Sequence, residues 1–358
     1  MRSLTLLISV LLTLLAGTSR ANVTAQNDRA VSANVFESLE ELARLVDISY
    51  CVGSTGIQTP FKCLSRCHEF PGFELITTWN TGPLLSDSCG YIAISHEPFE
   101  PRVLVVFRGT YSIANTIADL STQHADFVPF PVNGTDRAEC KNCTVHTGFL
   151  TSWQNTRSTI VPYVETALER HPGFKLVLVG HSLGGAVATI AALEFQARGH
   201  QPYVTTFGEP RVGNRALNSY IDKVFELDTT DVQQLRFRRV THVDDPVPLL
   251  PLEQWGYHMH AGEIFISKAA LPPGRGDLKH CVGDQDTECI AGQGRLRSDH
   301  IASRWWMPSK DGLWELFFAH RDYFWRLGLC MPTSDPWDWN GRQRTMMGND
   351  HDSLRQET

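Results

Sequence analysis

Residues 176–198 constrain the fold more than any other segment. An apolar run, Leu176-Val177-Leu178-Val179, leads through Gly180-His181-Ser182-Leu183-Gly184-Gly185 into a helix-forming stretch. The branched apolar run predicts a buried strand, and the small residues after the turn predict a helix packed closely against it. Glycines at the second position on either side of Ser182 remove β-carbons that would collide in so tight a turn. The pattern predicts a strand, a sharp turn and a helix that together present one serine.

The position of Ser182 is typical of a catalytic nucleophile. A helix that begins at the serine directs backbone N–H groups, including that of Leu183, and the positive end of its dipole toward the hydroxyl. A glycine-rich turn can match G-x-S-x-G by chance, but the strand before it and the small-residue helix after it favour catalysis. We interpret His181 as a packing residue beside the nucleophile.

The N-terminus has the features of a secretory signal. Arg2 precedes an apolar segment from Leu4 to Ala16, and Ser19-Arg20-Ala21 offers a small-residue cleavage site after residue 21. A membrane anchor is the alternative, but the apolar segment is shorter than the about 20 residues that span a bilayer. We therefore expect an exported protein that lacks residues 1–21.

The mature chain is acidic. Removal of residues 1–21 takes away two arginines and no acidic residue, so the formal charge changes from −7 to −9. Nucleic acid is therefore not expected as a partner. No internal repeat or Pro/Ser-rich linker divides the chain, so residues 22–330 are predicted to form a single domain. The polar run 331–358 is predicted to be a disordered tail outside the core.

Nine cysteines in an exported chain indicate disulfides and one leftover thiol. Three local pairs are candidates, and Cys51 would then remain for Cys330 as a long-range bridge, with Cys89 as a buried free thiol. Sequence alone does not determine this connectivity. The local pairs are Cys63 with Cys67, Cys140 with Cys143 and Cys281 with Cys289. N-glycosylation sequons occur at Asn22, Asn133 and Asn142, the last of them inside a proposed tight bridge.

Strand-like and helix-like segments alternate along the chain. Strands are predicted at 74–79, 91–95, 102–108, 203–207, 235–241 and 263–266, and helices at 35–48, 152–170 and 216–225. This alternation predicts an α/β fold with a mostly parallel central sheet covered by helices on both faces.

A serine nucleophile needs a base, and the base needs a carboxylate that orients it. A serine presented by such a strand–turn–helix is said to lie on a nucleophile elbow. In hydrolases with this elbow the chain order is serine, acid, histidine, so both partners should follow Ser182. Asp244 and Asp245 directly follow a predicted strand, where functional loops lie, and spacing does not separate them. The downstream histidines include His258, His260, His280, His300, His320 and His351. We favour His320, which a bridge at Cys330 would anchor.

Several motifs in order resemble those of the secreted fungal and yeast triacylglycerol lipases, an α/β-hydrolase family that also contains feruloyl esterases. They are Phe107-Arg108-Gly109-Thr110, His146-Thr147-Gly148-Phe149, the elbow, residues 208–214 (GEPRVGN), Asp245-Pro246-Val247-Pro248 and the interval from His320 to Cys330. The likeness runs from about Val35 to Cys330. It implies Asp245 as the acid, His320 as the base and the four disulfides proposed above.

The resemblance also implies an oxyanion hole and a lid. The hole would use the N–H of Leu183 with the N–H and hydroxyl of Thr110, although Thr110 by itself could simply end a strand. A short helix capped by Ser112 and bearing Ile113, Ile117 and Leu120 falls where the family keeps its lid. Phe127, Val128 and Phe130 follow it, and Thr116 stands where some members have a lid tryptophan. An ordinary surface helix is the alternative.

The resulting hypothesis is a secreted lipase that hydrolyses acylglycerols through an acyl-enzyme on Ser182. It needs no cofactor and no metal ion, because neighbouring groups activate the nucleophile. The expected partners are the acylglycerol substrate and, transiently, a membrane or emulsion surface at the lipid–water interface. Alternatives are a feruloyl or short-chain carboxylesterase of the same fold and a non-catalytic lipid-binding homologue.

Overall fold

The computed structural model describes residues 29–82, 86–110, 123–131, 139–229, 231–293 and 319–330. The predicted signal segment, the lid candidate at 112–120 and the tail after Cys330 lie outside these ranges. So do Asn22, Asn133, His300 and His351. Within the described ranges, no helix combines the length and the apolar character needed to cross a membrane.

An eight-stranded sheet runs through the molecule in the order β1-β2-β3-β6-β7-β8-β9-β10. Its strands are β1 Glu74–Asn80, β2 Cys89–Ser95, β3 Arg102–Phe107, β6 Lys175–His181, β7 Tyr203–Phe207, β8 Phe237–His242, β9 Glu263–Ile266 and β10 Leu278–His280. From β3 to β9 every pairing is parallel, whereas β1, β2 and β10 join antiparallel at the two ends. The mostly parallel sheet expected from the alternation of elements is confirmed, with antiparallel strands added at its edges.

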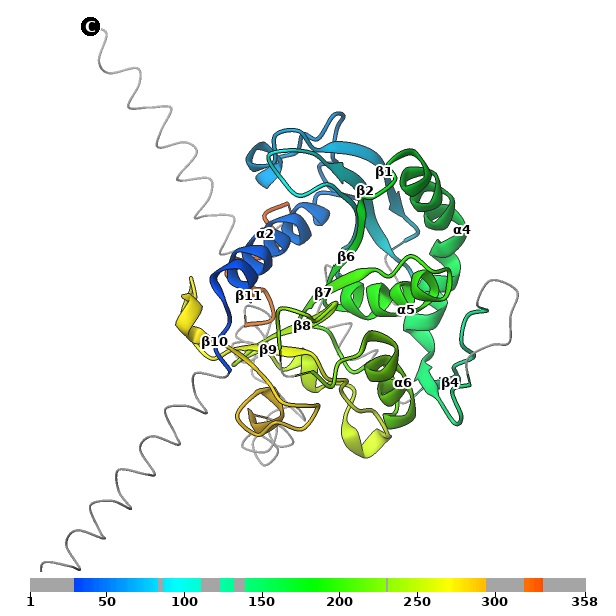
Figure 1. Ribbon diagram of the computed structural model, residues 1–358, viewed down its shortest axis with the longest axis vertical. Coiled ribbons are helices and arrows are strands. Elements are labelled where there is room, and N and C mark those ends of the chain that lie inside the picture. The colour runs from blue at the N-terminus through cyan, green and yellow to red at the C-terminus, as the bar shows by residue number, and fades with distance from the viewer. Residues whose placement is uncertain are drawn as a thin grey trace, which may run out of the picture.

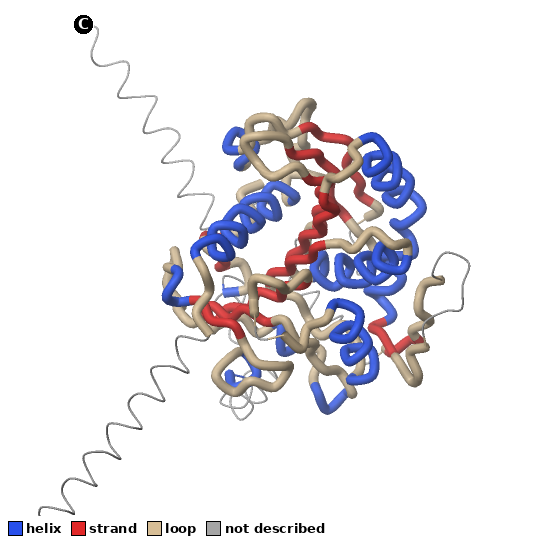
Figure 2. Tube along the Cα trace, viewed as in Figure 1, coloured by secondary structure: helices blue, strands red, loops and turns tan. Residues whose placement is uncertain are grey.

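Four helices cover the two faces of this sheet. Figure 1 shows α2 (Ala33–Ser49) on one side and α4 (Thr147–Arg170), α5 (Leu183–Ala197) and α6 (Arg215–Phe225) on the other. The same layers appear in Figure 2, where the strands pass between them. Because both faces are covered, β3 is buried along its whole length and β6 at every residue after Lys175.

Short elements decorate this framework outside the main sheet. They are the ribbon β4 (His124–Asp126) with β5 (Thr144–His146), the ribbon β11 (Asp322–Tyr323) with β12 (Trp325–Arg326), and the 3-10 turns Arg66–Glu69, Val247–Leu249, Glu253–Trp255 and Arg275–Asp277. None of these was expected from the sequence. Each has only two to four residues, which is too short for a hydrophobic period to show.

The largest difference in helix bounds concerns α4, which begins at Thr147 and not at Ser152. His146 is its N-cap, and the His146 side chain accepts a hydrogen bond from the N–H of Gly148 at 3.2 Å. A histidine cap followed by Thr147 and Gly148 carries no common start signal, so the first turn was missed. Only a side chain directed by the surrounding fold supplies this cap.

Four disulfides join the cysteines in the pairs that the sequence analysis proposed: Cys51–Cys330, Cys63–Cys67, Cys140–Cys143 and Cys281–Cys289. Cys89 is free and buried, and burial raises the pKa of its thiol to about 11. Asn142 is exposed within the Cys140–Cys143 loop. Its backbone carbonyl accepts a hydrogen bond from the Asn214 side chain at 2.7 Å.

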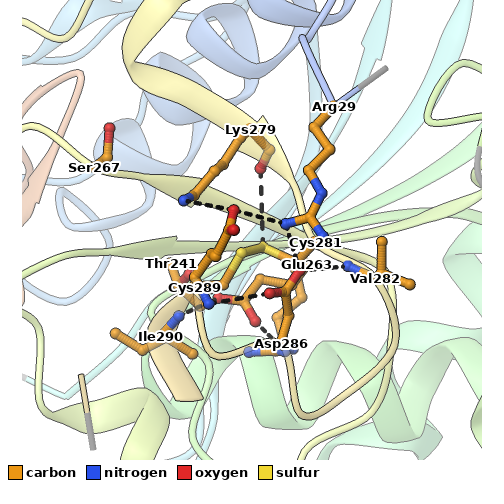
Figure 3. The surroundings of a disulfide bond; sticks show 12 residues. Arg29, Thr241, Glu263, Ser267, Lys279, Cys281, Val282, Asp286, Cys289 and Ile290 are labelled. Atoms are coloured by element: carbon orange, nitrogen blue, oxygen red, sulfur yellow. Dashed lines mark hydrogen bonds and ion pairs between the residues drawn. A yellow bond between two sulfur atoms is a disulfide. The ribbon is translucent and has the colours of Figure 1, made fainter. Parts of the chain in front are cut away.

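The Cys281–Cys289 bridge packs against a buried ion pair and the first described residues of the chain (Figure 3). Glu263 on β9 pairs with Arg239 at 3.1 Å, and Arg29 pairs with Asp286 at 3.1 Å. The Glu263 carboxylate also lies near both sulfurs, but the sulfurs are bonded to each other and are not available as metal ligands. This corner is structural and lies at the edge of the sheet, where Lys279 on β10 bridges to Ala30.

Candidate active site

Ser182 lies between β6 and α5 in the turn that the sequence predicts. It is the N-cap of α5, with φ 58° and ψ −131°, and only 1% of its surface is exposed. A non-glycine residue in this region costs about 1–3 kcal/mol, which the surrounding packing must offset. The elbow thus stores backbone strain at the residue proposed to do the chemistry.

The glycines on either side of Ser182 have the steric role expected of them. A β-carbon at Gly180 would lie 2.2 Å from the carbonyl oxygen of Gly184, and one at Gly184 would lie 2.6 Å from the carbonyl oxygen of Phe107. Both distances are far below van der Waals contact. Any side chain at either position would therefore push α5 away from β3 and β6.

The histidine and the acid meet across the carboxyl end of the sheet. Asp245 follows β8, His320 precedes β11, and both are completely buried. His320 Nδ1 lies 2.9 Å from both carboxylate oxygens of Asp245. Since the carboxylate can only accept, Nδ1 carries the proton and Nε2 is left as the basic nitrogen.

Two further groups hold Asp245. The Tyr323 hydroxyl donates to Oδ2 at 2.5 Å, and the N–H of Val247 donates to Oδ1 at 2.9 Å. Burial raises the pKa of Asp245, but His320, Tyr323 and Val247 together outweigh it, so the pKa lies below its usual value. The acid is therefore ionised at neutral pH and can stabilise an imidazolium at His320.

The His320 ring lies beside the residues that flank Ser182. A β-carbon at Gly208, which has φ +59°, would lie 2.8 Å from both His320 Cε1 and Asp245 Oδ2. The preceding residue, Phe207, accepts a hydrogen bond from the N–H of Ser182 at 2.9 Å. Gly208 is thus required where strand β7 ends under the acid and the base, a role that the sequence analysis did not assign.

Ser182 Oγ and His320 Nε2 are both buried, and neither has a hydrogen-bond partner among the residues that the structure describes. The serine–histidine hydrogen bond is therefore open in this structure. Such bonds are often loose without substrate and tighten when it binds. Two unpaired polar atoms at the end of the sheet are what an acyl-transfer site requires before substrate enters.

The candidate oxyanion residues lie next to the nucleophile. Thr110 is half-buried and follows Gly109, where a β-carbon would lie 2.8 Å from Ser182 Cβ. Leu183 is the first residue of α5, so its N–H has no partner within the helix. Both groups come from backbone segments that pass directly beside Ser182.

The other downstream candidates occupy different places. Asp244 is half-buried. Two histidines in the loop before β9 are engaged elsewhere: His258 with Arg215 at 3.3 Å, and His260 with the carbonyl of Ala261 at 2.8 Å. His280 is buried on β10. Among the described histidines, Asp245 is hydrogen-bonded to His320.

The sequence predicted no role for Tyr323. Its contact with Asp245 depends on the ribbon β11–β12, which turns at Phe324 with φ 61°. No pattern of hydrophobicity reports such a turn. The one sequence feature that pointed to this region was the short interval between His320 and Cys330.

A mostly parallel sheet, a serine on a strained elbow and a buried carboxylate–imidazole pair define a serine hydrolase of the α/β-hydrolase fold. Comparison with known proteins narrows the class. Residues 104–255 match the family model described as Lipase (class 3). The secreted mono- and diacylglycerol lipase 2 of Gibberella zeae is 48% identical, with 93% of this chain and 91% of that protein aligned. Lipase A of Sodiomyces alcalophilus is 47% identical, over 91% of this chain and 89% of its own.

Solved structures agree. The crystal structure of Lip2 lipase from Yarrowia lipolytica matches with a TM-score of 0.73 and 30% identity, covering 85% of this chain and 98% of that one. Lipase II from Rhizopus niveus matches with a TM-score of 0.63 and 26% identity, covering 84% of this chain and 99% of that one. The chain belongs to the class 3 lipase family and is a lipase.

Proposed function

We propose that this protein is a secreted lipase that cleaves acylglycerols at a lipid–water surface, with Ser182 as nucleophile, His320 as general base and acid, and Asp245 as the residue that orients His320. The buried contact between His320 Nδ1 and Asp245 carries the proposal, because it leaves Nε2 free to accept the serine proton. The relative from Gibberella zeae, named a secreted mono- and diacylglycerol lipase, supports both the substrate class and the export.

The reaction runs in two halves. His320 Nε2 takes the Ser182 proton as Oγ attacks the ester carbonyl, and the N–H groups of Thr110 and Leu183 bind the oxyanion. The proton then passes from His320 to the departing glycerol oxygen, which leaves an acyl ester on Ser182. Water, deprotonated by His320, attacks that ester, and the proton returns to Ser182 as the fatty acid leaves. Every proton is accounted for within the triad.

The surface contact and the glycans belong to the same proposal. Val128, which is 58% exposed, would lie on the lipid-facing rim. Asn22, Asn133 and Asn142 are proposed as glycan acceptors of the exported chain. The exposure of Asn142 supports its accessibility once the Cys140–Cys143 bridge has formed.

A substrate panel tests the proposal. Hydrolysis of long-chain mono-, di- and triacylglycerols is compared with that of soluble short-chain and feruloyl esters, each above and below its solubility limit. We expect activity on emulsified acylglycerols, and labelling by a fluorophosphonate probe that disappears in Ser182→Ala. Activity confined to the soluble esters would make the protein a carboxylesterase. Absence of labelling in the wild type would indicate a non-catalytic homologue.

A further inference from the structure

His181, the residue before the nucleophile, has a completely buried ring that is hydrogen-bonded at both nitrogens. Nδ1 lies 2.5 Å from the hydroxyl of Tyr50, and Nε2 lies 2.8 Å from the carbonyl oxygen of His320. The ring also contacts the ring of His320, with centroids 4.7 Å apart and the ring planes tilted by 31°. The triad mechanism gives His181 no role, yet its two hydrogen bonds join the end of α2 to the backbone of His320.

The direction of these hydrogen bonds follows from the chemistry of the groups. A carbonyl oxygen only accepts, so His181 Nε2 carries a proton. Burial, together with the neighbouring His320, lowers the pKa of His181 to about 3, so the ring is neutral and Nδ1 is an acceptor. The Tyr50 hydroxyl therefore donates to Nδ1. Replacing either partner by an apolar residue would leave a buried polar atom unpaired.

Tyr50 extends this contact to the strand end that carries Thr110. The backbone of Gly109 passes directly beside its hydroxyl oxygen. A β-carbon at Gly109 would lie 2.7 Å from that oxygen. Tyr50 itself is the C-cap of α2 and precedes Cys51, whose disulfide reaches Cys330. A directional series of hydrogen bonds thus runs from Tyr50, whose hydroxyl lies against Gly109, through His181 to the backbone of His320.

We propose that Tyr50 and His181 are positioning residues that hold the oxyanion strand end, the nucleophile turn and the backbone of the catalytic histidine in one fixed arrangement. The inference rests on the proposed roles of Ser182, His320 and Thr110. The neutrality of His181 matters as much as its geometry, because a second charged ring stacked on His320 would oppose formation of the imidazolium. The three segments are far apart in the chain: one follows β3, one lies between β6 and α5, and one precedes β11.

Tyr50→Phe tests the hydroxyl, and Tyr91→Phe is its matched control. Tyr91 is equally buried and donates to the carbonyl of Leu45 on the same helix at 2.9 Å, but on β2 and with no contact to the triad. The readouts are kcat and KM on a soluble short-chain ester, the rate of Ser182 labelling by a fluorophosphonate, and thermal unfolding. We expect Tyr50→Phe to lower kcat and the labelling rate about tenfold, with KM changed by no more than about twofold. This loss is smaller than the loss caused by removing a direct oxyanion donor, because Tyr50 acts only through the residues it positions. Tyr91→Phe should lower only the unfolding temperature.

His181→Gln and His181→Leu separate hydrogen bonding from packing. The glutamine amide can accept from Tyr50 and donate to the His320 carbonyl without taking up a charge. We expect it to retain kcat within a few-fold, whereas leucine loses at least as much as Tyr50→Phe. Equal impairment of the two variants, or a Tyr50→Phe enzyme with wild-type kcat and labelling, would overturn the proposal. Loss of labelling in the wild-type protein would instead reject the proposed function, so the two failures are distinguishable.

Discussion

Asp244 and Asp245 are adjacent in the chain but lie in different environments. Asp245 is completely buried and bonded to His320, Tyr323 and the N–H of Val247, whereas Asp244 is half-buried. The same residue type therefore has two different roles one position apart. The difference comes from the turn after β8, which buries the Asp245 carboxylate against His320 and leaves Asp244 half-buried.

This contrast predicts the outcome of a paired substitution. Asp245→Asn keeps the shape of the side chain but removes the charge that stabilises the imidazolium and fixes the Nδ1–H tautomer, so kcat should fall about 10⁴-fold. Asp244→Asn should leave kcat within about twofold, because an asparagine at a partly solvated site away from the triad changes little. Steady-state kinetics on one soluble ester compares both. A larger loss from Asp244→Asn would reverse the assignment of the acid.

Among the structural elements, helix α2 is hydrogen-bonded to the segment 319–330. Buried Asp47 on α2 accepts hydrogen bonds from the N–H groups of Gly328 and Leu329 and from the Ser65 hydroxyl. These bonds anchor the segment that contains His320, the proposed base. Burial nevertheless raises the pKa of Asp47, and the hydrogen bonds and Arg66 offset this only in part.

The raised pKa predicts how stability changes with pH. A carboxyl group whose folded pKa exceeds its unfolded pKa contributes most below the unfolded value, and that contribution is lost as pH rises through the folded value. Asp47→Asn cannot ionise and keeps an acceptor for both amides. The free energy of unfolding of the variant should therefore improve relative to wild type as pH rises from about 3.5 to 7.

Asp286→Asn is the control for this prediction, because the pKa of Asp286 is shifted in the opposite direction from that of Asp47. Burial raises the pKa of Asp286, but the N–H groups of Val282 and Glu288 and the charge of Arg29 outweigh it, so the pKa is lowered. Its stabilisation is present above the unfolded pKa and lost as pH falls. That variant should become worse relative to wild type as pH rises. Urea unfolding of each variant and of the wild type across the pH range measures both effects. If the free energy of unfolding of the two variants changed with pH in the same direction relative to wild type, the prediction would be wrong.

At the scale of the whole molecule, two disulfides close very different loops. Cys51–Cys330 joins residues 279 positions apart, while Cys63–Cys67 spans 4 positions. The long bridge ties the end of α2 to the last described residue and so closes almost the whole domain. The short one restrains only a turn.

Paired serine substitutions should show this difference in loop length. In the chain-entropy model, losing the long bridge costs about 5 kcal/mol and losing the short one about 2 kcal/mol. Cys51→Ser/Cys330→Ser should therefore unfold at clearly lower urea concentration than Cys63→Ser/Cys67→Ser, with wild type above both. Equal midpoints for the two double variants would show that the long bridge does not act by restraining the unfolded chain.

The sequence by itself determined what is local: the elbow around Ser182, the alternation of strands and helices, and the glycines that permit close approach of α5. These follow from periodicity and steric size, which a short window of residues contains. Strand and helix limits differ by only a few residues, apart from the start of α4, which depends on a cap from His146.

Only the tertiary structure decided which side chains meet. Spacing left Asp244 and Asp245 equivalent, and family resemblance was needed to select Asp245. Tyr50, His181 and His320 are separated in the chain by 131 and 139 positions, yet their polar atoms form consecutive hydrogen bonds. Hydrogen bonding depends on distance and direction in space, and neither is encoded in local hydrophobic pattern. The chain alone therefore predicts the serine on its sharp turn, and the folded sheet decides which carboxylate and which imidazole meet.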